Sequence, residues 1–106
     1  MDLYNEKTVI STAAEDEHLI RIGPTKLYNA TMYNAGGATA YFQLWEGTVA
    51  AGILIQTLQI PVGATGFYDF GERGFPSLGG FTMAASANPT DFATSGNAGW
   101  FTAVYA

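Results

Sequence analysis

Short runs of alternating residues, separated by glycine-containing turns, make up most of this chain. Alternation is typical of β-strands, because successive side chains of a strand point to opposite faces of a sheet. In residues 38–45, for example, Phe42 and Leu44 fall on one face and Gln43 falls on the other. A chain with this period almost throughout is expected to form β-sheets and no long helix.

The alternating runs predict eight short strands. Helix signals are weak: residues 12–15 match a capping box, but Gly23 and Pro24 follow too soon for more than one turn. Short strands at this spacing favour a sandwich, and eight of them favour a jelly roll. We therefore expect an all-β, single-domain antiparallel β-sandwich, jelly-roll-like, with about eight strands. The predicted strands are residues 7–11, 18–22, 26–33, 38–45, 52–60, 65–70, 80–86 and 99–105.

Residues 27–46 predict a β-hairpin, because two runs rich in Tyr, Thr, Phe and Trp flank a glycine-containing turn. The turn contains Asn34, Gly36 and Gly37, and we expect its two glycines to supply the positive φ that a tight turn needs. Proline and glycine residues between other alternating runs predict further turns at Pro61, Gly63, Gly79 and Gly80.

The composition predicts assembly with other subunits. The 106 residues match one domain, and only 12% of them are charged, against a usual share of roughly 25%. A chain this short buries about 65% of its unfolded surface, so a monomer has a thin core and leaves apolar surface exposed. Contiguous exposed apolar patches usually mark interfaces. We therefore expect a homo-oligomer.

Four aromatic residues are the candidate interface: Tyr41, Trp45, Trp100 and Tyr105. Trp45 and Trp100 lie near predicted strand ends, from which a ring can reach past the sheet to a partner. The same rings could instead form a platform on which sugars stack. Aromatic packing in a core or a subunit interface is the alternative, and we favour the interface.

The charge balance argues against nucleic acid as a partner. The net charge is −5, and Lys7, Arg21, Lys26 and Arg73 do not cluster into a phosphate-binding stripe. The chain has no Cys, which excludes disulfides and fits a reducing cytoplasm. No segment has the 18 or so consecutive apolar residues of a membrane span, and the first ten residues lack the pattern of a signal peptide.

Residues able to carry out chemistry are sparse. His18 is the single histidine, and no Ser-centred or Cys-centred motif accompanies it. Asp69, Glu72 and Asp91 are too few and too scattered to specify Ca²⁺, which takes 6–8 oxygen ligands. We therefore expect no enzyme, no cofactor and no metal site.

Eight sequence elements follow one another along residues 27–105. They are Asn34-Ala35-Gly36-Gly37, Leu44-Trp45-Glu46-Gly47, Ile53-Leu54-Ile55, Pro61-Val62-Gly63, Phe67-Tyr68-Asp69-Phe70, Gly74-Phe75-Pro76, Gly79-Gly80 and Tyr105. In this order they resemble small phage virion proteins, namely the β-sandwich or jelly-roll cement (decoration) proteins of capsid shells and related head-fibre and tail-appendage domains. The first 25 residues match no part of the pattern. We therefore divide the chain into an N-terminal arm with the first strands (1–25) and a sandwich body (26–106).

This resemblance implies a non-enzymatic structural protein of a phage virion. A cement protein stabilises the head shell by bridging its subunits, so the implied partners are the major capsid protein and further copies of the chain, in a trimer. The implied location is the capsid surface, after synthesis in the host cytoplasm. Two alternatives stay open at this point: a tail, baseplate or fibre component of the virion, and a carbohydrate-binding β-sandwich that uses the Tyr41/Trp45 face.

Overall fold

The computed structural model describes residues 6–106, which form nine β-strands and no helix. All eight predicted strands are present, and one short strand, β7, was not predicted. The strands are β1 (Lys7–Ile10), β2 (Glu17–Ile22), β3 (Thr25–Asn34), β4 (Ala40–Glu46), β5 (Ile53–Ile60), β6 (Thr65–Asp69), β7 (Phe75–Ser77), β8 (Gly80–Ser86) and β9 (Gly99–Tyr105).

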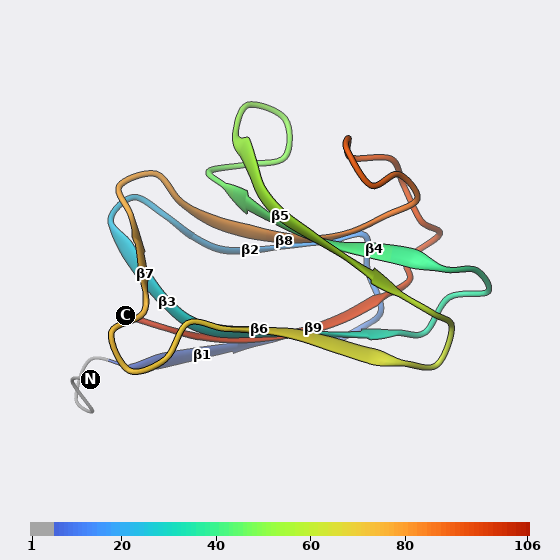
Figure 1. Ribbon diagram of the computed structural model, residues 1–106, viewed down its shortest axis with the longest axis horizontal. Helices are drawn as coiled ribbons and strands as arrows, with labels where there is room; N and C mark the ends of the chain where they lie inside the picture. Colours follow the sequence, from blue (N-terminus) through green and yellow to red (C-terminus); the bar gives the residue numbers. More distant parts are fainter. Residues whose placement is uncertain (1–5) are drawn as a thin grey trace.

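The strands form two antiparallel sheets that lie one above the other (Figure 1). Sheet A has the order β1-β9-β3-β6, with β7 also paired to β3, and sheet B has the order β2-β8-β4-β5. Most connections cross from one sheet to the other. Two antiparallel layers whose main strands are connected in this order, with the short β7 added to sheet A, are a jelly roll, so the predicted fold class is confirmed.

The predicted hairpin over residues 27–46 is wrong. β3 pairs with β9 and β6 in sheet A, whereas β4 pairs with β8 and β5 in sheet B. Residues 35–39 therefore form an arch between the sheets. The alternation that identified both strands says which residues share a face, but it carries no information about which strand is the neighbour.

The side chain of Asn34 stabilises this arch, and no glycine with positive φ is involved at Gly36 or Gly37. The Asn34 side chain accepts a hydrogen bond from the N–H of Gly36 (2.9 Å) and donates to the carbonyls of Ala38 (3.0 Å) and Ile60 (2.9 Å). Neither Gly36 nor Gly37 has positive φ, contrary to the prediction. Gly36 is instead required for space, because a Cβ there would lie 2.8 Å from the Cβ of Ala98.

The other predicted turn residues lie at the ends of strands. Gly63 and Gly80 have φ values of 77° and 86°, where glycine is the favoured residue. Pro61 directly follows β5, and Gly79 directly precedes β8. Three of these four residues are exposed, and Gly80 is buried within the sheet pairing.

The core lies between the sheets and is formed by alternate residues of each strand. Phe42 is at its centre, with its ring centroid 4.7 Å from that of Tyr68 and 6.0 Å from that of Phe101. The Tyr68 hydroxyl donates a hydrogen bond to the carbonyl of Phe42, and burial raises the pKa of Tyr68 far above its usual range. Apolar residues from both sheets complete the core, among them Leu27, Met32, Leu44, Phe81, Met83 and Ala103.

The first 25 residues contribute a strand to each sheet. β1 pairs with β9 at the edge of sheet A, and β2 pairs with β8 at the edge of sheet B. Residues 1–5 of the predicted arm lie outside the described residues. Residues 7–10 and 17–22 are thus edge strands of the sandwich, and each contributes to the outer face of its own sheet.

Candidate binding face of the sandwich

The outer face of sheet B is covered at Gln43 of β4 and Ser86 of β8 by the loop between β8 and β9, residues 87–98. Gln43 of β4 is fully buried, and its Nε2 donates to the carbonyls of Asn88 (2.8 Å) and Asp91 (2.7 Å). The Ser86 hydroxyl donates to the carbonyl of Asp91 and accepts from the N–H groups of Asn88 and Ala93. These polar contacts hold the loop on the sheet. In Figure 1 the loop, in orange to red, lies on the side of sheet B that faces away from sheet A.

Asp16 holds the far end of the same loop. Its Oδ1 accepts hydrogen bonds from the N–H (2.9 Å) and hydroxyl (3.0 Å) of Ser95 and from the N–H of Asn97 (2.9 Å). Partial burial alone would raise the pKa of Asp16, but these donors favour the ionised form and lower its pKa below 3.8. The Asp16 side chain is therefore a specific anchor of this loop.

Replacing Asp16 with asparagine is expected to lower stability by about 1 kcal/mol at neutral pH, because neutral hydrogen bonds replace charge-assisted ones. The pKa of Asp16 is lower in the folded state than in the unfolded state, so ionisation favours folding. This contribution is present above about pH 3.9 and is lost as the pH falls through the folded-state pKa. Thermal unfolding from neutral pH to about pH 3 should show the two proteins converging. A difference in stability that stays constant across this range would contradict the assignment, and Glu17→Gln is the matched control.

Trp45 lies on this covered face and is only 8% exposed. Its Nε1 donates to Oε1 of Gln43 at 3.0 Å, so the indole is held within the domain. This corrects the expectation that Trp45 reaches past the sheet to a partner. Tyr41 shares the face and is half-buried, and Tyr105 packs partly buried against the core. Trp100 lies on the opposite outer face, so the four predicted aromatic residues do not form one surface.

The outer face of sheet A is open over the described part of the chain. Tyr33 of β3 stands directly opposite Trp100 of β9, and their side chains are 43% and 42% exposed. Ile10 (61%) and Phe67 (64%) stand on the two edge strands, on either side of Thr102 and Thr31. We call this surface the sheet A face. Its residues are Thr8, Ile10, Asn29, Thr31, Tyr33, Thr65, Phe67, Asp69, Trp100, Thr102 and Val104.

The sheet A face is nearly neutral on an acidic domain. Asp69, at the end of edge strand β6, is its one charged residue, whereas the chain as a whole has a net charge of −5. The domain measures 38 × 26 × 21 Å, and Figure 1 looks along the shortest axis at both sheets edge-on, so the face spans at most 38 by 21 Å. A face of that size matches the roughly 800 Å² that each partner buries in a standard protein interface.

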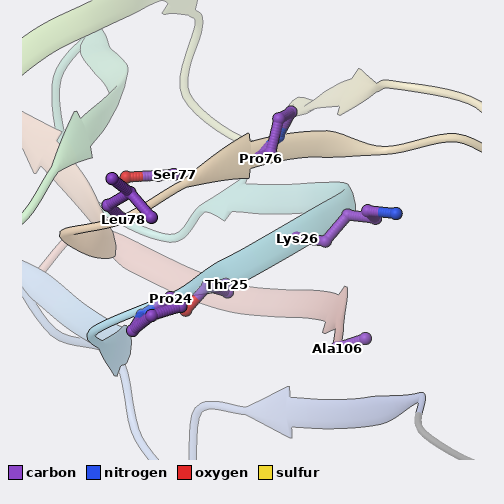
Figure 2. Close-up of a pocket in the computed structure, with 7 residues that line it drawn as sticks. All are labelled: Pro24, Thr25, Lys26, Pro76, Ser77, Leu78 and Ala106. Atoms are coloured by element: carbon purple, nitrogen blue, oxygen red, sulfur yellow. The ribbon is translucent and has the colours of Figure 1, made fainter.

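Two open hollows lie beside the exposed Leu78. The first has a volume of about 450 Å³ and lies at the start of β3 (Figure 2). It is lined by Pro24 and Lys26, by Pro76 of β7 and by Leu78 of the turn after β7. The second, of about 570 Å³, contains the side chain of Glu46, whose carboxylate accepts a hydrogen bond from the Ser77 hydroxyl. Each lining has one ionisable side chain, Lys26 in the first hollow and Glu46 in the second.

The remaining ionisable residues do not converge on a site within residues 6–106. No group of three or more His, Asp or Glu side chains is placed to hold a metal ion there. His18 of β2 has its Nδ1 2.9 Å from Oε2 of Glu15, and both side chains are partly exposed. In the same residues, no helix is long and apolar enough to cross a membrane.

Fold and surface together define the class: a jelly-roll β-sandwich with one outer face partly covered by a loop and one open, nearly neutral outer face that carries aromatic residues. Comparisons with protein-family models, with curated proteins and with solved structures found no match to this chain.

The sequence pattern identified Trp100 but missed Tyr33, Phe67 and Ile10. The available signal for Tyr33 was its position on the same side of its strand as Asn29 and Thr31, opposite the apolar side.

Proposed function

We propose that this protein is a non-enzymatic structural protein of a phage virion, and specifically a capsid cement protein that binds the shell through the sheet A face. One observation carries the proposal: a broad, nearly neutral face with exposed Trp100, Tyr33 and Phe67 on an acidic domain. The jelly-roll fold and the order of turn and strand motifs, which resembles that of cement proteins, support the same function.

The chemistry of the face suits adhesion. Burying aromatic and aliphatic side chains stabilises a complex by about 25 cal/mol per Å² of apolar surface, offset by the cost of association. Threonines between the rings add hydrogen-bonding groups without an ionic desolvation penalty. A protein bound at many equivalent junctions stabilises a shell by mass action, because it binds the assembled state and not the dispersed subunits.

The proposed partner is the major capsid protein at the junctions between shell subunits, and the proposed location is the capsid surface. A tail, baseplate or fibre component would use the same face against a different virion protein. Fold alone does not distinguish these roles. Imaging of the positions that the bound protein occupies on virions distinguishes them directly.

Trp100→Ala is expected to weaken binding to shells that lack this protein by about 2 kcal/mol or more, which is roughly thirtyfold in affinity. The ring lies on the surface, so the variant should fold like the parent. Leu78→Ala, which truncates an exposed apolar residue away from the sheet A face, is the matched control and should bind normally. Moderate salt should change attachment little, because charged contacts are few. Normal binding by both Trp100→Ala and Phe67→Ala would contradict the proposed face.

The Tyr33–Trp100 pair supports a second candidate function, carbohydrate binding. The two rings are adjacent, similarly exposed and flanked by Thr65 and Thr102, which can donate hydrogen bonds to sugar hydroxyls. A glycan array tests this function. Specific binding that is lost in Tyr33→Ala and Trp100→Ala, with no affinity for shells, would replace the cement function with recognition of sugars.

A further inference from the structure

The sandwich has exposed strand edges, and most of them carry features that hinder pairing with another strand. An exposed edge presents unpaired N–H and C=O groups, and charged residues, proline and short length protect it. β1 has four residues and contains Lys7, while β2 contains Glu17 and Arg21. The edge formed by β6 and β7 is broken into pieces of five and three residues, with Asp69 in one and Pro76 in the other.

The edge of sheet B formed by β5 lacks this protection. β5 has eight residues, ILIQTLQI, none of them charged, glycine or proline, and it pairs only with β4. The nearest charged residues in sequence are Glu46 and Asp69. A bulge at Ile55 interrupts the start of the strand, but residues 56–60 pair regularly with residues 40–44. These five residues are an uncharged, regular edge.

We propose that β5 pairs antiparallel with β5 of a second copy of this chain, which joins the two B sheets into one continuous eight-stranded sheet. In an antiparallel pair, directly opposed residues point to the same face of the sheet, and along one strand only every second residue points to that face. Two residues of β5 that oppose each other across a two-fold axis must therefore be an even number of positions apart. The axis then passes through a residue and not between two neighbouring residues. Centred on the regular stretch, the axis passes through Leu58. Thr57 then lies opposite Gln59 of the second copy, and Leu58 lies opposite its own counterpart.

The residues of β5 suit a second copy of the same chain. Two chains that each have a net charge of −5 repel, and a junction without charged side chains avoids adding like charges directly opposite each other. Thr57 and Gln59 are exposed on the outer face, where they can hydrogen-bond across the junction, and the partly exposed Leu58 gains an apolar neighbour. A foreign strand would obtain specificity from side-chain pockets, and neither of the two hollows beside Leu78 is lined by a residue of positions 56–60.

The geometry also limits the assembly to two copies. A two-fold contact uses the same surface on both partners and therefore closes. Each copy has one unprotected edge, so pairing leaves only edges that carry charge, proline or short length. A dimer formed in this way takes the place of the three-fold arrangement that the resemblance implies. It does not depend on the cement function, because the sheet A face belongs to the other layer and stays uncovered.

The test is the mass of the purified full chain by sedimentation equilibrium at tens to hundreds of micromolar. A dimer of the 11.3 kDa chain is expected. The double variant Thr57→Lys/Gln59→Lys places two pairs of like charges across the junction and should weaken the dimer at least about tenfold, as should Thr57→Glu/Gln59→Glu. Mixing the two variants should restore a dimer, since each lysine then faces a glutamate. Restoration by mixing also shows that both variants are folded.

Three outcomes would overturn the proposal. They are a monomer across the whole concentration range, a trimer, and a dimer that persists unchanged in both double variants. Thr31→Lys is the matched control, because it adds one positive charge to the sheet A face and leaves β5 intact. It should remain dimeric, and dissociation of the dimer by Thr31→Lys would place the contact on the sheet A face instead.

Discussion

Replacing Gly80 with alanine is expected to lower the free energy of unfolding by about 3–5 kcal/mol. Gly80 has a φ of 86°, and a Cβ there would lie 1.9 Å from the carbonyl oxygen of Arg21 and 2.8 Å from its carbonyl carbon. Both atoms are backbone of β2, which pairs with β8 at this point, so no side-chain rotation relieves the clash. Denaturant unfolding followed by circular dichroism measures the loss.

Gly37→Ala is the matched control for this substitution. Gly37 lacks positive φ, and a Cβ there would meet no atom within 4 Å. The stability of this variant should stay within about 0.5 kcal/mol of the parent. Equal stability of the Gly80 and Gly37 variants would mean that the β2–β8 register is incorrect.

Truncating Phe42 to alanine is expected to cost about 3–5 kcal/mol, the range for removing a buried aromatic side chain. Phe42 is fully buried and packs against Tyr68 of the other sheet, so its loss opens a cavity between the layers. A domain of this size has a total stability of about 5–15 kcal/mol. The variant should therefore melt at a far lower temperature, as differential scanning calorimetry would show.

Phe67→Ala is the control for the core substitution and connects stability with function. The Phe67 ring is largely exposed on edge strand β6, so its removal should leave the melting temperature nearly unchanged. The same variant should lose adhesion if the sheet A face binds a partner. Large destabilisation by Phe67→Ala, or none by Phe42→Ala, would contradict the assignment of inner and outer faces.

The existence of the strands was predictable from the sequence, and their pairing was not. Period-two alternation is a local property, and it placed eight strands within about two residues of their observed bounds. β7 was missed because three residues that include Pro76 do not form an alternating run. The hairpin error has a related cause, since the arch at Asn34 and a tight hairpin turn use the same residue types.

The candidate site was only partly predictable, as the two tryptophans illustrate. Trp45 and Trp100 both occur in strands with aromatic neighbours, yet one is buried and the other exposed. The Trp45 indole is bound to the side chain of Gln43, whose amide also donates to carbonyls of the loop of residues 87–98, whereas Trp100 lies on the open sheet A face. That arrangement depends on contacts between distant parts of the chain, which no local pattern encodes.

The position of β9 determines when the proposed binding surface can exist. β9 follows every other strand in sequence, yet it lies inside sheet A between β1 and β3 and carries Trp100. Until it has been synthesised and inserted, β1 has no neighbour and Tyr33 lacks the ring beside it. Pairings between distant segments of this kind form slowly. The proposed binding surface is therefore complete only once β9 has joined sheet A, and a chain that lacks β9 cannot form it.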